Sequence, residues 1–115
     1  MHVDVRKSGD VVIVDLSGKL VAGVGDTILH DVIDELVAEG WKKILLNLSE
    51  VKAVDSAGIG ELVAGLRLAS RFGVALKLLN LHEHVRRSLH LSELLPLFEV
   101  FDREKDALAH FASAT

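Results

Sequence analysis

Short apolar segments with β-strand character alternate along this chain with longer segments whose apolar residues recur every three or four positions. This alternation predicts strands and helices in turn, an order typical of an α/β layer structure with helices packed on a mixed sheet. We expect one domain over residues 1–115, with a sheet of about four or five strands covered by about four helices. The expected strands are 3–6, 11–16, 44–48, 74–79 and 98–101, and the expected helices are 26–40, 56–71, 82–91 and 102–111.

Charge and cysteine content narrow the range of functions. The chain has 13 basic and 17 acidic side chains, and this net charge of -4 disfavours direct nucleic-acid binding. The absence of cysteine excludes disulfides and thiol catalysis, and it favours a cytoplasmic location over a secreted one. The beginning of the chain lacks a signal-peptide pattern, and the apolar runs are far shorter than the ~20 residues that cross a bilayer. We therefore expect no membrane insertion.

Motifs for catalysis, metals and cofactors are missing. No nucleophile, base and orienting group stand at a recognisable spacing, and Gly-x-Ser-x-Gly is absent, so we expect no enzyme. His82 and His84 are two residues apart on an expected helix and point in different directions, so we expect no metal site. Val63 stands where a dinucleotide motif beginning at Gly58 needs its third glycine, and Gly18–Lys19 lacks the rest of a P-loop. We expect no cofactor.

The segment from 47 to 60 joins an apolar strand to a helix through a short connection at 49–55. Either Asp55 or Ser56 is expected at the helix N-cap, where a side-chain oxygen accepts a backbone N–H. Gly58 and Gly60 follow in the first turn, although each weakens a helix by about 1 kcal/mol relative to alanine. Their missing side chains therefore indicate a close approach, either by a partner chain or by the neighbouring strand.

A helical wheel divides the helix 56–71 into two faces. An ordinary solvent-facing side is mostly charged, whereas this one is small and partly apolar, which favours a docking surface. The side expected to face the sheet holds Ile59, Leu62, Val63, Leu66, Ala69 and Ser70, and the outward side holds Ser56, Ala57, Gly60, Ala64, Arg67, Leu68 and Arg71. We predict partner contacts at Asp55, Ser56, Ala57, Gly58, Gly60, Ala64 and an exposed Leu68.

The run Val54-Asp55-Ser56-Ala57-Gly58-Ile59-Gly60 resembles the signature of STAS domains, the family of bacterial anti-sigma-factor antagonists. Residues 43–51, 73–81, 85–89 and 104–108 resemble further parts of the family's strands and helices, so the resemblance covers nearly the whole chain. It implies a single STAS-like domain. It also implies that the serine directly after the aspartate, Ser56 here, is phosphorylated by an anti-sigma factor that is itself a Ser/Thr kinase.

The resemblance further implies a switch. Unphosphorylated, the domain would bind the anti-sigma factor and so release a sigma factor, and a Ser/Thr phosphatase would restore this state after phosphorylation. A phosphate adds about -1.5 to -2 charges, which a helix N-terminus accepts. A partner packed against Ser56 would instead meet a dianion beside Asp55.

Other interpretations remain open. Ser56 could be a plain capping serine, and Asp55 could either cap the helix or orient Ser56 for phosphoryl transfer. The family usually has Gly-x-Leu-Asp early in the chain, whereas Val21 follows Leu20 here, in a loop rich in glycine from Val21 to Gly25. The alternative is thus a STAS module without a switch, in a transporter, lipid-trafficking or signalling complex. Direct binding of a nucleotide or lipid by the domain itself is a third possibility, which the glycine-rich loop leaves open.

Overall fold

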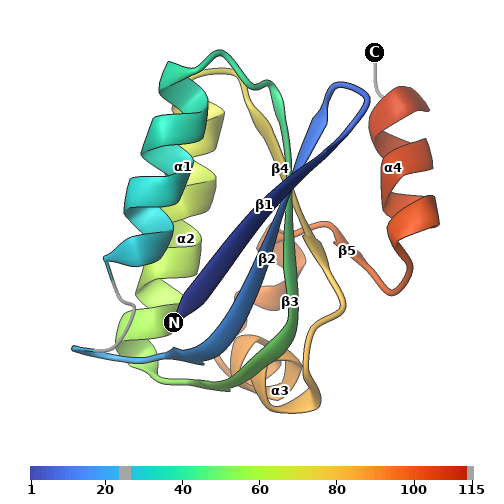
Figure 1. Cartoon of the computed structure of the whole chain (residues 1–115). Helices are drawn as coiled ribbons and strands as arrows, with labels where there is room; N and C mark the ends of the chain where they lie inside the picture. The colour runs from blue at the N-terminus through green and yellow to red at the C-terminus, as the bar shows by residue number, and fades with distance from the viewer. Residues whose placement is uncertain (24–26, 114–115) are drawn as a thin grey trace.

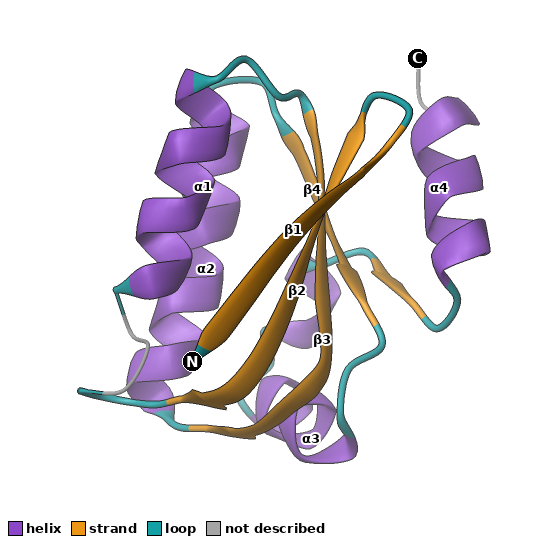
Figure 2. Ribbon diagram, in the orientation of Figure 1, coloured by secondary structure: helices purple, strands orange, loops and turns teal. Residues whose placement is uncertain are grey.

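The computed structural model describes residues 1–23 and 27–113 of the 115-residue chain. Within them, a five-stranded mixed sheet lies between α1 and α2 on one face and α4 on the other (Figure 1, Figure 2). The predicted α/β class is confirmed, with five strands and four helices in the described residues. In chain order the elements are β1 (His2–Ser8), β2 (Val11–Leu20), α1 (Ile28–Ala38), β3 (Lys43–Val54), α2 (Ser56–Arg71), β4 (Ala75–Leu79), α3 (Glu83–Leu91), the 3-10 turn η1 (Leu95–Leu97), β5 (Val100–Phe101) and α4 (Glu104–Ser113).

The order of the strands brings the ends of β2 and β3 together. The sheet runs β1-β2-β3-β4-β5, and β1 and β2 are antiparallel while the other pairs are parallel. A parallel pair needs a crossover that returns the chain to the same edge, and helices supply it here. Since β2 and β3 run in the same direction, they end side by side, and α2 begins at that edge (Figure 1). Binding sites in α/β folds commonly lie at the carboxyl ends of strands.

The central strand β3 is covered on both faces. Ile44, Leu45 and Leu46 are fully buried, as expected for the predicted apolar strand. Leu46 belongs to the larger core under α1, α2 and α3, whereas Leu45 belongs to the smaller core where Phe111 of α4 packs. Consecutive side chains of one strand therefore connect two helical layers.

Two strands extend further than the sequence pattern indicated. β2 continues to Leu20 and β3 to Val54, so most of the predicted connection at 49–55 is strand. The pairing of β2 with β3 shifts register between Asp15 and Ser17 and again after Gly18, and these irregularities let it reach Leu20 and Val54. At the other end of the chain, β5 is shorter than the predicted strand 98–101.

The glycine-rich loop and the start of the first helix are described only in part. Val21, Ala22 and Gly23 leave β2, and α1 is described from Ile28. The residues predicted to complete the loop and open the helix, Gly25 and Asp26, lie outside the described residues.

The residues that α2 buries differ from those that the helical wheel predicted to face the sheet. Leu68 is buried with 9% of its surface exposed, so the prediction of an exposed Leu68 is wrong, while the predicted inward Ser70 is exposed. The wheel assumed a single neighbour, the sheet, but α1 packs beside α2 as well. A Cβ at Gly65 would lie 2.6 Å from Ile33 Cδ1, which shows how closely the two helices approach. The buried residues of α2 are Gly58, Leu62, Gly65, Leu68 and Ala69.

Gly58 and Gly60 have different surroundings. A Cβ at Gly58 would overlap the backbone carbonyl of Leu20 and lie 2.7 Å from Val54 Cγ2, whereas a Cβ at Gly60 would meet nothing within 4 Å. The close approach at Gly58 is therefore made by the neighbouring strands, and the predicted surface contact at this position corresponds to a buried residue. The first turn of α2 lies directly on the ends of β2 and β3.

This difference predicts opposite effects of alanine at the two positions. We expect Gly58→Ala to destabilise the fold by about 1–3 kcal/mol, because backbone atoms of β2 must move to admit the methyl group. Gly60→Ala, the matched control, should stabilise it by about 0.5–1 kcal/mol through better helix propensity. Urea unfolding of the two variants checks this, and equal effects of both would contradict the packing described for Gly58.

Candidate functional site

Asp55 is the N-cap of α2 and connects this helix to the loop after β2. Its extended backbone (φ -113°, ψ -172°) turns the chain from β3 into the helix. The backbone N–H of Gly58 donates to Asp55 Oδ1 at 2.9 Å, and the backbone N–H of Ala22 donates to Oδ2 at 3.0 Å. Both carboxylate oxygens are thus engaged, and the capping interpretation of Asp55 is confirmed. The N–H of Ala22, followed by that of Gly58, lowers the pKa of this carboxyl below its usual value.

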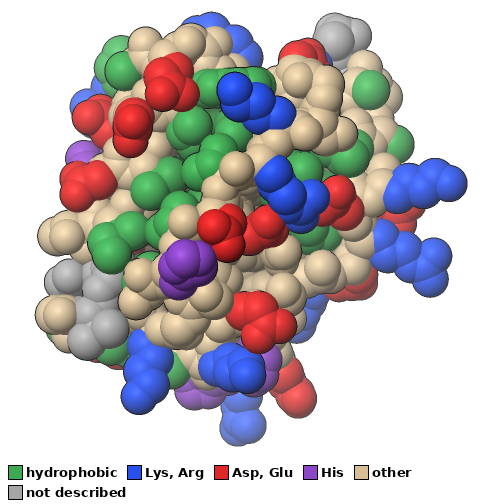
Figure 3. Space-filling model, viewed as in Figure 1, with side chains coloured by type: hydrophobic (Ala, Val, Ile, Leu, Met, Phe, Trp, Pro, Cys, Tyr) green, Lys and Arg blue, Asp and Glu red, His purple; other side chains and the backbone are tan. Residues whose placement is uncertain are grey.

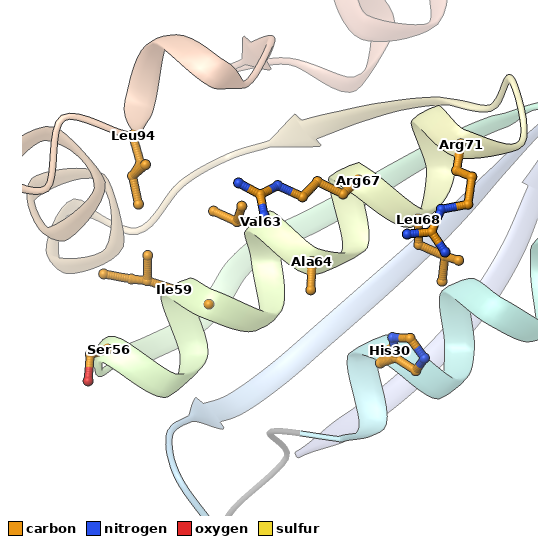
Figure 4. Close-up of a pocket in the computed structure, with 10 residues that line it drawn as sticks. His30, Ser56, Ile59, Val63, Ala64, Arg67, Leu68, Arg71 and Leu94 are labelled. Atoms are coloured by element: carbon orange, nitrogen blue, oxygen red, sulfur yellow. The ribbon is translucent and has the colours of Figure 1, made fainter.

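Ser56 is the first residue of α2 and is exposed. Its hydroxyl makes no hydrogen bond within residues 1–23 and 27–113, and none joins it to the carboxylate of Asp55 there. Figure 4 shows the hydroxyl at the tip of the helix, pointing away from its axis. With Asp55 as the cap, no hydrogen bond from the described residues holds the hydroxyl of Ser56.

A groove of about 580 Å³ begins at Ser56 and follows the outward face of α2. One side is formed by α1, and Leu94, which follows α3, stands at the other (Figure 4). The lining residues are His30, Ser56, Ile59, Gly60, Val63, Ala64, Arg67, Leu68, Arg71 and Leu94. The predicted Ser56, Gly60 and Ala64 are brought together here, and Leu68 lines the groove although most of its side chain is buried.

Several lining residues were not among the predicted contacts. Arg67 and Arg71 share the outward face of α2 with Ser56, so the periodicity of the helix could have found them. His30 and Leu94 come from other parts of the chain and reach the groove only through the packing of α1 and α3. Ala57, next to Ser56, is half-buried and is not among the residues that line the groove.

Metal binding and membrane crossing have no support in the described part of the chain. No group of three or more histidine, aspartate or glutamate side chains there could hold a metal ion. No helix in residues 1–23 and 27–113 combines the length and the apolar character that a bilayer span requires.

The fold and the site define an α/β module with an exposed serine at a helix N-terminus beside a groove. The STAS domain family matches residues 2–107, and the chain belongs to this family. It is 35% identical over 77 residues to a Thermotoga neapolitana protein named as a candidate anti-sigma factor antagonist, covering 67% of this chain and 68% of the relative. The anti-sigma F factor antagonist of Paenibacillus polymyxa is 24% identical over 108 residues, which cover 94% of this chain and 92% of that protein.

A solved structure has the same arrangement. The crystal structure of a candidate anti-sigma factor antagonist from Thermotoga maritima superimposes with a TM-score of 0.83 at 29% sequence identity. The match covers 94% of this chain and 92% of that one. The predicted resemblance to STAS domains is therefore confirmed, both for the family and for the fold.

The lowered pKa of Asp55 predicts a pH-dependent role in stability. The ionised carboxylate accepts two backbone N–H groups, so its contribution is present above the unfolded-state pKa of about 3.9 and is lost as the pH falls through the lower folded-state pKa. Asp55→Asn should be less stable than the wild type at pH 7, and the difference should shrink towards acid pH. Urea unfolding from pH 7 to about pH 2.5 measures it. A difference that stays constant over this range would show that the charge of Asp55 does not matter.

Proposed function

We propose that this chain is an anti-sigma-factor antagonist whose binding to a kinase-type anti-sigma factor is controlled by phosphorylation of Ser56. The observation that carries the proposal is that two adjacent residues have different roles at the start of α2. Asp55 caps α2 with both carboxylate oxygens, and Ser56 presents a hydroxyl without a hydrogen-bond partner in the described residues. The names of the relatives as anti-sigma factor antagonists support the role. The domain acts by binding and not by catalysis.

Phosphorylation at Ser56 changes the surface and leaves the fold in place. The kinase transfers the γ-phosphoryl group of ATP to Ser56 Oγ, which loses its proton, and ADP is released. Because the cap belongs to Asp55, phosphorylation of Ser56 breaks no hydrogen bond of its hydroxyl within the part of the chain that the structure describes. The positive end of the α2 dipole favours the added charge of about -1.5 to -2. A partner that covers Ser56 would have to desolvate this charge next to the carboxylate of Asp55, which opposes binding.

The proposed contact surface consists of Asp55, Ser56, Ala57, Gly60 and Ala64, all of them exposed or half-buried. Gly58 acts beneath this surface, since it allows α2 to begin directly on β2. Leu68 contributes through the small part of its side chain that lines the groove. The unphosphorylated surface binds the anti-sigma factor, a sigma factor is released, and a Ser/Thr phosphatase resets the switch. Such a cycle takes place in the cytoplasm, where transcription occurs.

The unusual Val21 is compatible with this switch. The contact between the loop and α2 runs from the backbone N–H of Ala22 to Asp55, so it does not depend on the side chain at position 21. Val21 itself is half-buried. An aspartate at this position is therefore not required to hold Asp55 beside the loop.

The phosphorylation site can be tested directly. The protein is incubated with ATP and an extract of its own host, and intact mass followed by peptide mapping locates any phosphate. We expect one phosphate on Ser56, none on Ser56→Ala, and normal phosphorylation of Ser70→Ala, which removes an exposed serine at the other end of the same helix. An extract that phosphorylates a known family member and leaves this chain untouched would remove the switch and point to a constitutive STAS module.

The switch also predicts the behaviour of two variants at the level of binding. Ser56→Ala should retain the anti-sigma factor in the presence of ATP, because it cannot be phosphorylated. Ser56→Asp should bind about tenfold or more weakly, because it places a charge where the partner must exclude water. Co-purification of each variant with the kinase measures the difference. If both variants bind like the wild type, Ser56 does not control the interaction.

A further inference from the structure

The groove along α2 is positively charged, whereas the chain as a whole is negatively charged. Among the ten lining residues in the described part of the chain, the ionisable side chains are Arg67, Arg71 and His30, and none is acidic. The chain carries a net charge of -4. The acidic residues of α1, among them Asp31, Asp34 and Glu35, are exposed, and Figure 3 shows acidic side chains over this helix, on the face turned to the viewer. A cationic groove thus lies next to an acidic helix.

The two arginines of the groove have no partner in the described part of the chain. Neither Arg67 nor Arg71 makes an ion pair or a hydrogen bond there, whereas Arg6 bonds to Asp15 and Glu104, and Arg86 pairs with Asp102. In Figure 4 the side chain of Arg67 lies along Val63, and that of Arg71 turns towards Leu68. Their guanidinium groups are exposed and available to carboxylates of another molecule.

Apolar surface surrounds these cations. Between Ser56 and Arg67 the groove is lined by Ile59, Gly60, Val63 and Ala64, and Leu94 stands on its far side. Of the four large apolar side chains that are exposed in residues 1–23 and 27–113, three lie close in sequence to the lining. Phe72 follows Arg71, and Leu91 and Leu97 stand three residues either side of Leu94. An apolar centre with charged groups at one end is typical of a surface that binds another protein.

The spacing of the lining residues fits a helix as the occupant. They recur along α2 at 56, 59–60, 63–64, 67–68 and 71, which is one straight face of a helix. This face is about 22 Å long, the length of a helix of about 15 residues. Arg67 and Arg71 are one turn apart, so they match two carboxylates placed at i and i+4 on a second helix. Helices that bind in grooves present apolar residues at i, i+3, i+4 and i+7.

We propose that the groove binds an amphipathic helix of the partner that carries at least two acidic side chains at the end facing Arg67 and Arg71. The inference deepens the proposed function, on which it rests for the anti-sigma factor as the source of this helix. Ser56 is about 16 Å along the axis of α2 from Arg67, beyond the screening length of about 8 Å at physiological ionic strength. The acidic anchor therefore contributes to binding independently of the charge at Ser56, and it selects the partner without being part of the switch.

The test uses the isotopically labelled full chain and two synthetic peptides of about 15 residues. Both form amphipathic helices with apolar residues at i, i+3, i+4 and i+7, and one carries glutamates at i and i+4 in its last turn where the other carries glutamines. Amide chemical shifts are followed at about 0.05 M and about 0.3 M salt. We expect the acidic peptide to shift residues of the groove, to bind about three- to tenfold more tightly than the glutamine peptide, and to weaken at the higher salt.

The double variant Arg67→Gln/Arg71→Gln should abolish the preference for the acidic peptide. Arg87→Gln/Arg103→Gln removes the same charge from exposed positions outside the groove and should leave the preference unchanged. Equal binding of both peptides, an unchanged preference in the groove variant, or no groove shifts at about 1 mM peptide would each overturn the proposal. The titration involves neither a kinase nor phosphorylation of Ser56. If the peptides bind as expected but the host extract does not phosphorylate Ser56, only the proposed switch is contradicted. If Ser56 is phosphorylated but the peptides do not bind as expected, only the proposed groove is contradicted.

Discussion

The carboxylate of Asp55 holds together the parts of the molecule on which the candidate site depends. It receives the N–H of Gly58 from the first turn of α2 and the N–H of Ala22 from the loop after β2. These two bonds satisfy one of the free donors of the helix and attach the loop to it. The backbone N–H of Asp55 in turn donates to the carbonyl of Leu20 at 3.4 Å. The position of Ser56 is therefore set by the hydrogen bonds of its neighbour Asp55.

The same carbonyl of Leu20 also explains why position 58 is glycine. Any side chain there would overlap it, so α2 can begin at this point only because Gly58 has no Cβ. The long pairing of β2 with β3, with its two shifts of register, places Leu20 beside Val54 and thereby brings the carbonyl under the helix. A serine at a helix N-terminus is common. A serine whose hydroxyl bonds to none of the described residues, next to an aspartate that caps the helix, is the feature that suits a modification site.

The groove begins at Ser56 and carries a second charged feature at its far end, the arginines Arg67 and Arg71. Its cationic end lies about three to four turns of α2 away from Ser56, and its walls come from α1 and from the segment after α3. Under the proposed switch, a partner that covers the whole groove would meet a charge that changes at Ser56 and a charge that stays constant at Arg67 and Arg71. Specificity for the partner and control of binding can then reside in different residues of one helix, because charges so far apart on a surface are screened from each other.

Periodicity and turn chemistry were sufficient for the order of the elements, for α2 between residues 56 and 71, and for the outward position of Ser56, Gly60 and Ala64. These are local properties, because the spacing of apolar residues and the conformational freedom of glycine act over a few residues. The same reasoning left Asp55 and Ser56 as alternative caps, since both side chains can accept a backbone N–H.

Only the tertiary structure decided between them, because the N–H of Ala22 that completes the contacts of Asp55 lies 33 residues away in the chain. The tertiary structure also placed Leu68 inside, since the buried face of a helix is set by all its neighbours, and α1 was a neighbour that the periodicity of α2 could not reveal. His30 and Leu94 reached the groove for the same reason. The sequence by itself determined which elements form and which residues each one presents. Which of those residues meet was determined by packing, because contacts between distant segments depend on how whole elements fit together.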